Sequence, residues 1–288
     1  MDAKRTLQTI GSEVSNDFAK SRTILSFEEY LKLFAQEPRR QSRNAAQYLK
    51  DVIDHFGIDQ VSHPSGKIRR FKIFDLMENE RDGRVAGQEE VQNAIYRLVG
   101  NFVRAGRINK LIFLHGPNGS AKSSIVDALK RGMEQYSELP QGALYKLNWV
   151  FPTDKLIKGS IGFGEKLAAG GELASYAHLE VENIEVRQPC EMRDHPLFVL
   201  PRVDRRRMLE QAYKEMKDEP GGKDFVIPDS IMEGELCHKC RRIYTALMSV
   251  NHGDYLKVLR HVQVERFYIS RRYQTGTMTV EPQMSVDA

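Results

Sequence analysis

The segment Gly116-Pro-Asn-Gly-Ser-Ala-Lys122-Ser123-Ser124 has the residue types and spacing of a phosphate-binding loop. The general template is Gly, four residues, Gly, Lys, and then Ser or Thr. Gly116, Lys122 and Ser123 fall in register with this template, and Ala121 replaces its second glycine. A chance Gly/Ser loop is the alternative, but an apolar run before it and an amphipathic helix after it favour phosphate binding.

Each part of this loop has a physical role in holding a nucleoside triphosphate, most simply ATP, together with Mg²⁺. Glycines let the loop turn its backbone N–H groups inward, and the start of a helix adds its positive dipole end. Lys122 supplies a cation for the β- and γ-phosphates, and the Ser123 hydroxyl suits a Mg²⁺ ion. If position 121 needs a positive φ, Ala121 costs about 1 kcal/mol there. We expect Lys122 to be the catalytic residue of a cofactor-binding set that comprises Gly116, Pro117, Asn118, Gly119, Ser120, Ala121, Lys122, Ser123 and Ser124.

The three cysteines form a second group of residues with metal-binding chemistry. Cys237-His-Lys-Cys240 has zinc-knuckle spacing, and Cys190 could add a third thiolate. His195 or His238 could complete four ligands for a structural Zn²⁺. Two reduced cysteines at a helix start, or a thioredoxin-like redox pair, are the alternatives. If zinc binds, its removal by a chelator should loosen residues 190–240.

Helical signals dominate the chain before residue 66. Ser26 and Glu29 form a capping box at the start of one predicted helix. A second helix is predicted over about Asn44–Phe56, with Gly57 as its C-terminal stop. His63-Pro-Ser-Gly66 marks a turn or linker. We therefore expect a small N-terminal helical unit with its linker over residues 1–66.

The pattern around the phosphate loop is that of an α/β domain. An amphipathic helix after Gln88 and a second one after the loop flank a short apolar run, which is typical of a buried parallel strand. Strand, loop, helix and strand make one βαβ unit and predict a parallel sheet covered by helices. The predicted elements are the helix Glu89–Gly106, the strand Leu111–Leu114, the helix Lys122–Tyr136 and the strand Tyr145–Trp149.

The chain after Pro152 has weaker signals. Glycines mark a loop-rich stretch, and helices are predicted over about Asp204–Lys217 and after Cys237. Val262–Val280 has strand-like alternation with a turn at Thr275-Gly276. We therefore expect residues 67–288 to form one nucleotide-binding domain, incomplete at its C-terminal end, with a long insertion over about 152–260.

Composition excludes several functional classes. The net charge of +4 is small for 43 basic and 39 acidic residues, and the basic pairs are scattered, so a nucleic-acid partner is not expected. No apolar stretch has the length of a membrane span, and residues 1–20 lack an apolar signal core. Only three cysteines occur. We expect a cytoplasmic protein with no membrane partner.

His115–Ser124, preceded by Val85-Ala-Gly-Gln-Glu89, resembles the ATPase module of PrkA-type serine protein kinases. Residues 191–201, 264–272 and 280–287 resemble the same family. The resemblance implies a P-loop NTPase fold of AAA type, Mg-ATP as cofactor, a protein substrate and a homo-oligomeric assembly. By the same likeness, Val85, Ala86 and Gly87 would lie against the adenine base. The alternative is that Gly87 only helps to start a helix.

The chain departs from the family pattern at one point. After residue 124 no apolar run ends in Asp-Glu or Glu-x-x-Asp, and no arginine finger can be placed. In the family this acidic strand and the kinase-like region come later, so we expect a fragment of a longer protein or a truncated relative. The leading hypothesis is the ATP-binding module of a PrkA-like serine protein kinase, supporting serine phosphorylation or an ATP-driven conformational change. The rivals are a non-catalytic nucleotide-sensing and assembly module, and a stand-alone P-loop kinase acting on a small acceptor.

Overall fold

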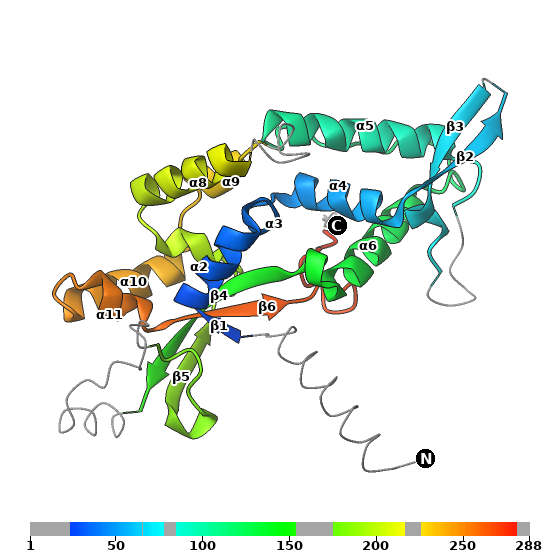
Figure 1. Ribbon diagram of the computed structural model, residues 1–288. Coiled ribbons are helices and arrows are strands. Elements are labelled where there is room, and N and C mark those ends of the chain that lie inside the picture. The colour runs from blue at the N-terminus through cyan, green and yellow to red at the C-terminus, as the bar shows by residue number, and fades with distance from the viewer. Residues whose placement is uncertain (1–23, 65, 78–84, 154–174, 217–225, 281–288) are drawn as a thin grey trace, which may run out of the picture. The chain divides into compact units, whose positions relative to one another are not determined.

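The computed structural model describes residues 24–64, 66–77, 85–153, 175–216 and 226–280 (Figure 1). These residues form a mixed α/β structure that divides into two compact units, each built from separate stretches of chain. Unit 1 contains the described parts of 1–41, 144–212 and 231–267, and unit 2 contains those of 42–143, 213–230 and 268–288. Among the described residues, no helix is both long enough and apolar enough to cross a bilayer.

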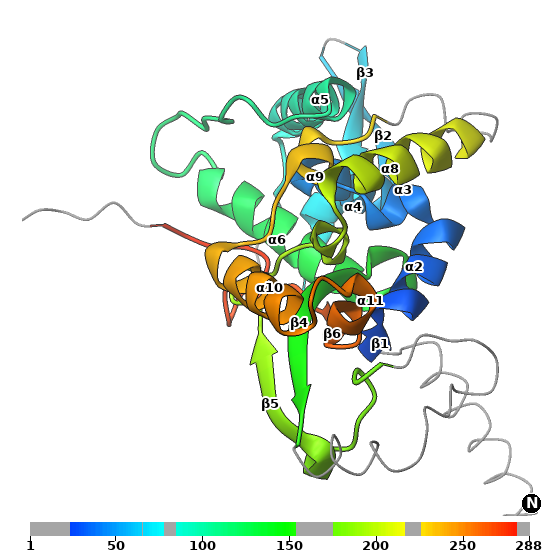
Figure 2. The same ribbon diagram turned by 90° about the vertical axis from the view of Figure 1, so that its left-hand side faces the viewer.

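Unit 1 is built on a four-stranded antiparallel sheet with the order β1-β6-β4-β5 (Figures 1 and 2). The strands are β1 (Ile24–Ser26), β4 (Leu144–Pro152), β5 (Ile184–Pro189) and β6 (Val262–Phe267). In the register, Leu147 is opposite Val264, and Trp149 is opposite Val262 on one side and Gln188 on the other. Leu147, Trp149 and Val150 are fully buried, so the middle of β4 lies at the centre of this unit's core.

The helices of unit 1 begin at local caps. The Ser26 and Glu29 capping box starts α2 (Phe27–Gln36), as predicted, and this helix packs on β6. The Cys237 side chain accepts from the backbone N–H of Cys240 at the start of α10 (His238–Val250). The other helices are α3 (Pro38–Gln41), η3 (Val181–Asn183), η4 (Pro196–Val199), α8 (Arg202–Met216), α9 (Asp229–Glu233) and α11 (Tyr255–Leu259), of which α8 and α9 contain residues of both units.

Unit 2 contains the long helices α4 (Ala45–Phe56), α5 (Glu89–Ala105) and α6 (Lys122–Glu138), and α4 contacts the other two. Asn44 caps α4, and Gly57 follows it at φ +79°, a conformation that favours glycine. Gly106 ends α5 in the left-handed region. These bounds confirm the three predicted helices. The remaining elements of the unit are β2 (Ile58–His63), β3 (Gly66–Phe71), η1 (Lys72–Asp75) and η2 (Pro140–Gly142). β2 and β3 pair antiparallel on either side of the predicted turn at 63–66, of which residue 65 lies outside the described residues.

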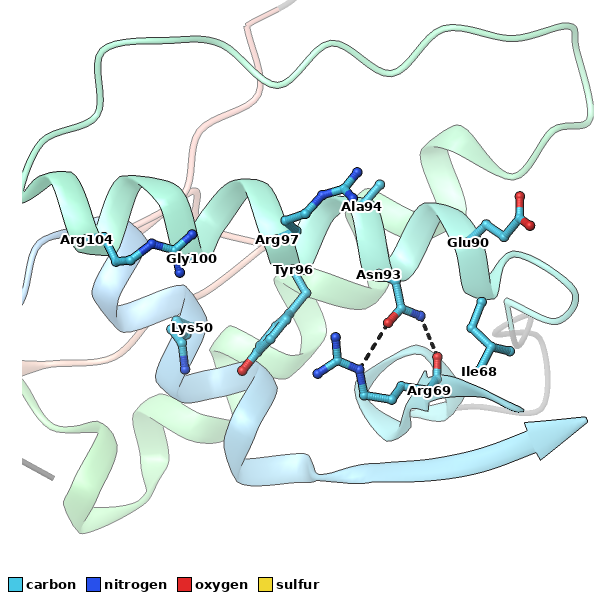
Figure 3. Close-up of a pocket in the computed structure, with 10 residues that line it drawn as sticks. All are labelled: Lys50, Ile68, Arg69, Glu90, Asn93, Ala94, Tyr96, Arg97, Gly100 and Arg104. Carbon is cyan, nitrogen blue, oxygen red and sulfur yellow. Dashed lines mark hydrogen bonds between the residues drawn. The ribbon is translucent and has the colours of Figure 1, made fainter. Parts of the chain in front are cut away.

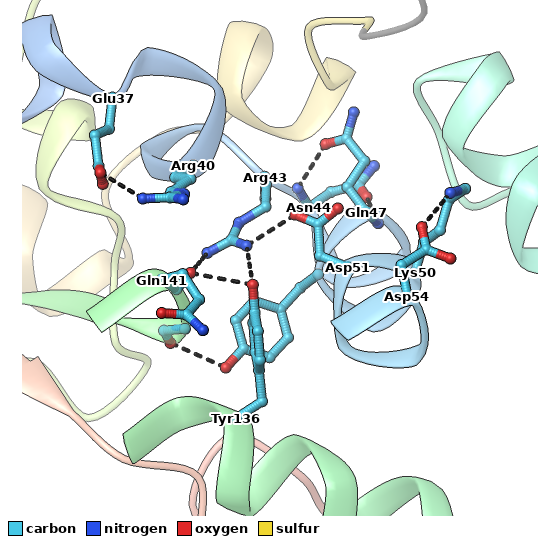
Figure 4. A network of polar contacts seen from close by, with 12 residues as sticks. Glu37, Arg40, Arg43, Asn44, Gln47, Lys50, Asp51, Asp54, Tyr136 and Gln141 are labelled. Atoms are coloured by element: carbon cyan, nitrogen blue, oxygen red, sulfur yellow. Dashed lines mark hydrogen bonds and ion pairs between the residues drawn. The ribbon is translucent and has the colours of Figure 1, made fainter. Parts of the chain in front are cut away.

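A buried guanidinium connects the start of α4 to the end of α6 (Figure 4). Arg43 contacts Asp51 Oδ2 at 2.9 Å and donates to Tyr136 Oη at 3.3 Å and to the Gln141 carbonyl at 3.0 Å. The Arg43 side chain is 2% exposed. Since hydrogen bonds to charged groups are stronger than neutral ones, this network holds the C-terminal end of α6 in place.

The parallel sheet predicted around the phosphate loop differs from what the structure shows. Within the described residues both sheets are antiparallel, and the predicted strand Leu111–Leu114 lies outside any helix or sheet. The side chains of Leu111 and Phe113 are 96% and 83% exposed. A buried parallel strand needs neighbouring strands and covering helices, and the described chain supplies neither at this position. The predicted strand 145–149 is confirmed within β4, but its partners β5 and β6 run antiparallel to it.

Candidate functional site

The nine predicted phosphate-binding residues lie in unit 2, where residues 116–121 form a loop and residues 122–124 form the first turn of α6. Gly119 has φ +80°, and Ala121, the N-cap residue of α6, has φ +60° and ψ +17°. Position 121 therefore does need a left-handed backbone, and an alanine there costs about 1 kcal/mol relative to glycine. A Cβ at Gly116 would lie 2.8 Å from Ser120 Oγ, so this position also favours glycine.

The Lys122 ammonium lies over the loop. Its Nζ donates to the carbonyl oxygens of Gly116 and Pro117, both at 2.8 Å, and to Ser120 Oγ at 3.2 Å. Ser123 and Ser124 are exposed in the first turn of α6. The first N–H groups of a helix have no partner within it, so this end of α6 offers donors as well as a positive dipole end to an anion.

The residues predicted to contact the base lie just before α5. Val85 is buried, its N–H donates to the Phe74 carbonyl at 3.1 Å, and its own carbonyl accepts from Gln92 Nε2 at 3.5 Å. Ala86 and Gly87 are exposed, and Gly87 has φ +74°. These contacts tie Val85 to η1 and α5 rather than to the phosphate loop. A base pocket formed by the three residues stays a prediction.

The predicted cysteines come together in unit 1. The Sγ atoms of Cys190, Cys237 and Cys240 and a carboxylate oxygen of Asp194 all lie within 4.8 Å of one another. Cys190 follows β5, Asp194 precedes η4, and the other two cysteines lie at the start of α10. The four groups, which we call the cysteine cluster, could hold a metal ion.

The thiols of the cysteine cluster influence one another electrostatically. The pKa of Cys190 is lowered to about 7, chiefly because the Cys240 thiol donates to its sulfur. The same interaction, together with burial, raises the pKa of Cys240. Burial also raises the pKa of Cys237. Without a cation, the cluster therefore favours one thiolate over several, because neighbouring thiolates repel.

The fourth group of the cluster is Asp194, not the predicted His195 or His238. His195 Nε2 bonds to the Gln41 carbonyl at 2.7 Å, and its Nδ1 accepts from the Leu197 N–H at 3.2 Å. Enclosure of the imidazole by protein atoms lowers the pKa of His195 to about 4. Both ring nitrogens of His195 are thus hydrogen-bonded to backbone groups outside the cluster. The sequence did offer one signal for Asp194, because its carboxylate comes only four residues after Cys190. Side chains so close in sequence can reach the same ion within one turn of the chain.

Two surface hollows lie apart from both groups of residues. One of about 540 Å³ lies between β3 and α5, where Arg69 contacts Asn93, and four basic side chains line it (Figure 3). The other, of about 290 Å³, lies between η4 and the start of α10. Neither is lined by a residue of the phosphate loop or of the cysteine cluster. Their lining residues give no reason to place the chemistry there.

A glycine-containing loop with left-handed residues at Gly119 and Ala121, followed by a long helix whose first residue is lysine, is the arrangement that the phosphate-loop motif predicts. Residues 25–154, somewhat less than half of the chain, match the family model of the PrkA AAA domain. The match spans β1 to β4 and includes the whole phosphate loop. No curated protein and no solved structure matches the chain. The family identifies an ATP-binding module of a PrkA-like protein.

Proposed function

We propose that this chain binds Mg-ATP through residues 116–124 as the AAA-type module of a PrkA-like serine protein kinase. In that role, nucleotide binding supports protein serine phosphorylation or drives a conformational change. The observation that carries the proposal is the position of the Lys122 ammonium, 2.8 Å from two loop carbonyls at the N-terminus of a 17-residue helix. The match of residues 25–154 to the PrkA AAA domain supports it independently.

The residues of the loop would divide the work of holding the phosphates. Lys122 would exchange its carbonyl partners for the β- and γ-phosphate oxygens, which neutralises part of their charge. Ser123, whose side chain is exposed, would ligate the Mg²⁺ ion that the same phosphates bind. Backbone N–H groups of residues 118–123 would donate to the phosphates. Bound Mg²⁺ would supply charge neutralisation for phosphoryl transfer.

The base would lie against Val85, Ala86 and Gly87 in this proposal. Burial of Val85 and the left-handed turn at Gly87 fix the backbone immediately before α5. Two exposed residues, Ala86 and Gly87, leave that backbone accessible to a ligand. Residues 67–288 would then act as one nucleotide-binding domain with an insertion over about 152–260.

A nucleotide-sensing module whose output is assembly is the second candidate, and one observation favours it. Phosphoryl transfer or hydrolysis in this class needs an acidic strand end that holds Mg²⁺ and positions water. Among the described residues, the strands of the larger sheet end at Ser26, Pro152, Pro189 and Phe267. None of these strand ends is itself acidic, and the pair Glu28-Glu29 after β1 belongs to the first turn of α2, where Glu29 caps the helix. Nucleotide-dependent oligomerisation without turnover would support this candidate over a kinase.

The deciding experiment is calorimetric titration of the chain with ATP, with and without Mg²⁺. We compare the wild type with Lys122→Ala and with Lys130→Ala. Lys130 is on the same helix and bonds to Thr279 Oγ1 at 2.8 Å, so it is a control of equal charge change. We expect saturable binding that weakens at least about tenfold, or 1.4 kcal/mol, in Lys122→Ala alone.

Two results would contradict the proposal. One is the absence of heat at millimolar ATP for the wild type. The other is equal affinity in the two lysine variants, which would place the nucleotide away from the loop. Circular dichroism of each variant would verify that the helices are intact before affinities are compared.

A further inference from the structure

The buried carboxylate of Asp194 lies beside the three cysteine thiols of the cysteine cluster. Asp194 is 7% exposed and accepts a hydrogen bond from the Cys237 N–H at 2.8 Å. Within the described parts of the chain, Asp194 forms no ion pair with a lysine, arginine or histidine. A carboxylate is costly to bury without a compensating positive charge. A bound cation next to Asp194 would supply the compensating positive charge that no described side chain supplies.

The spacing of the sulfur atoms is that of a tetrahedral metal centre. With Zn–S bonds of about 2.3 Å, tetrahedral geometry places two sulfur ligands about 3.8 Å apart. Cys190 Sγ and Cys237 Sγ are 3.8 Å apart. All four ligand atoms of the cysteine cluster fall within 4.8 Å of one another. One ion can therefore reach all of them after small side-chain adjustments.

N–H donors surround the sulfur atoms and would stabilise them as thiolates. The Asp194 N–H donates to Cys190 Sγ at 3.2 Å, and the Cys240 N–H donates to Cys237 Sγ at 3.5 Å. The indole of Trp149 makes no conventional hydrogen bond at Nε1, yet it is close enough to lower the pKa of Cys240. Hydrogen-bond donors next to metal ligands orient those ligands and tune their basicity.

We propose that Cys190, Asp194, Cys237 and Cys240 bind one structural Zn²⁺ ion. Thiolate-rich tetrahedral sites select zinc among the common divalent ions. Three thiolates and one carboxylate complete four-coordination, which leaves no open position for a substrate and makes the site structural. On binding, each protonated thiol releases its proton to solvent. The ion would join the end of β5 to the start of α10, which are separated by about 50 residues of sequence.

Metal analysis of the intact chain tests the proposal independently of nucleotide binding. The protein is purified without chelators, its metal content is measured by mass spectrometry, and the metal-free form is titrated with CoCl₂. We expect about one zinc per chain and a thiolate-to-cobalt charge-transfer band with tetrahedral ligand-field absorption. Less than a tenth of an equivalent of zinc, combined with no cobalt band, overturns the proposal. A Cys190–Cys237 disulfide in the unreduced, alkylated chain overturns it as well.

A pair of carboxylate variants tests the fourth ligand. Asp194→Asn keeps an oxygen that can accept from the Cys237 N–H but removes the anionic ligand. Glu191→Gln is the matched control, because Glu191 is exposed and pairs with Lys239 at 2.8 Å outside the cluster. We expect zinc affinity, measured by competition with a chromogenic chelator, to fall at least about tenfold in Asp194→Asn only. Equal affinities in the two variants overturn the assignment of Asp194.

Discussion

The phosphate loop and the cysteine cluster are built in opposite ways. The loop is nine consecutive residues whose shape depends on local backbone angles, and most of it faces solvent. The cluster joins two separate stretches of unit 1, residues 190–194 and 237–240, and three of its four residues are buried. Substitutions in the loop should therefore change ligand affinity with little change in stability. Substitutions beside the cluster should change the stability of the fold itself.

The largest expected effect belongs to Trp149, beside the cluster. Its side chain is fully buried in β4, so Trp149→Ala should lower the free energy of unfolding by about 3–5 kcal/mol. Asn118→Ala in the exposed phosphate loop should change it by less than about 0.5 kcal/mol. Urea unfolding followed by circular dichroism measures both, because Trp149 is the chain's single tryptophan and its fluorescence is lost in the variant. Similar changes in the two variants would refute the contrast.

A smaller but still large effect on stability is expected at Arg43, which contacts the C-terminal end of α6, the helix that follows the phosphate loop. Arg43→Ala removes the buried guanidinium that contacts Asp51, Tyr136 and the Gln141 carbonyl, and we expect a loss of about 2–3 kcal/mol. Arg40→Ala is the control, because its pair with Glu37 is exposed and should contribute less than about 0.5 kcal/mol. Urea midpoints at constant m-value compare the two. Equal midpoints would mean that the buried network of Figure 4 contributes nothing to the position of α6.

Ala121 is an exception to the rule that loop substitutions leave stability unchanged, because its backbone is left-handed. A substitution there should change the free energy of unfolding by about 1 kcal/mol or less. Ala121→Gly removes the strain of φ +60° but adds entropy to the unfolded chain, so a small net stabilisation is expected. Ala128→Gly, in the middle of the same helix, should instead destabilise by about 1 kcal/mol or more, because glycine disfavours helices and a buried methyl group is lost. Thermal unfolding shows whether each variant is more or less stable than the wild type. Destabilisation by Ala121→Gly would show that position 121 is not left-handed in solution.

Features that depend on neighbouring residues were predictable from the sequence. The Ser26 capping box, the stop at Gly57 and the left-handed end of α5 at Gly106 each follow from contacts within a few residues, and each is found in the structure. The need for a positive φ at Ala121 likewise follows from the template of the loop. Local signals therefore predicted the long helices of unit 2, whereas nucleotide binding by the loop stays a prediction.

Features that depend on distant partners were not predictable in the same way. The motif Cys237-x-x-Cys240 suggested a metal site. Asp194 lies next to this motif only because the fold brings the segment after β5 to the start of α10. Strand direction has the same limitation, because an apolar run does not reveal which strand lies beside it. The stretch β4 was correctly predicted as a strand, yet its antiparallel partners come from residues beyond Pro152.

The segment Leu111–Leu114 offers the smallest expected effect and the sharpest disagreement between sequence and structure. Its four apolar residues predict a buried strand, whereas Phe113 is 83% exposed. Phe113→Ser should therefore change the free energy of unfolding by less than about 0.5 kcal/mol. Phe102→Ser is the matched control in the same unit, because Phe102 is 8% exposed in α5 and its loss should cost about 3 kcal/mol or more. Urea unfolding of both variants decides, since a cost above about 2 kcal/mol for Phe113→Ser would mean that this run is buried, as the sequence pattern predicts.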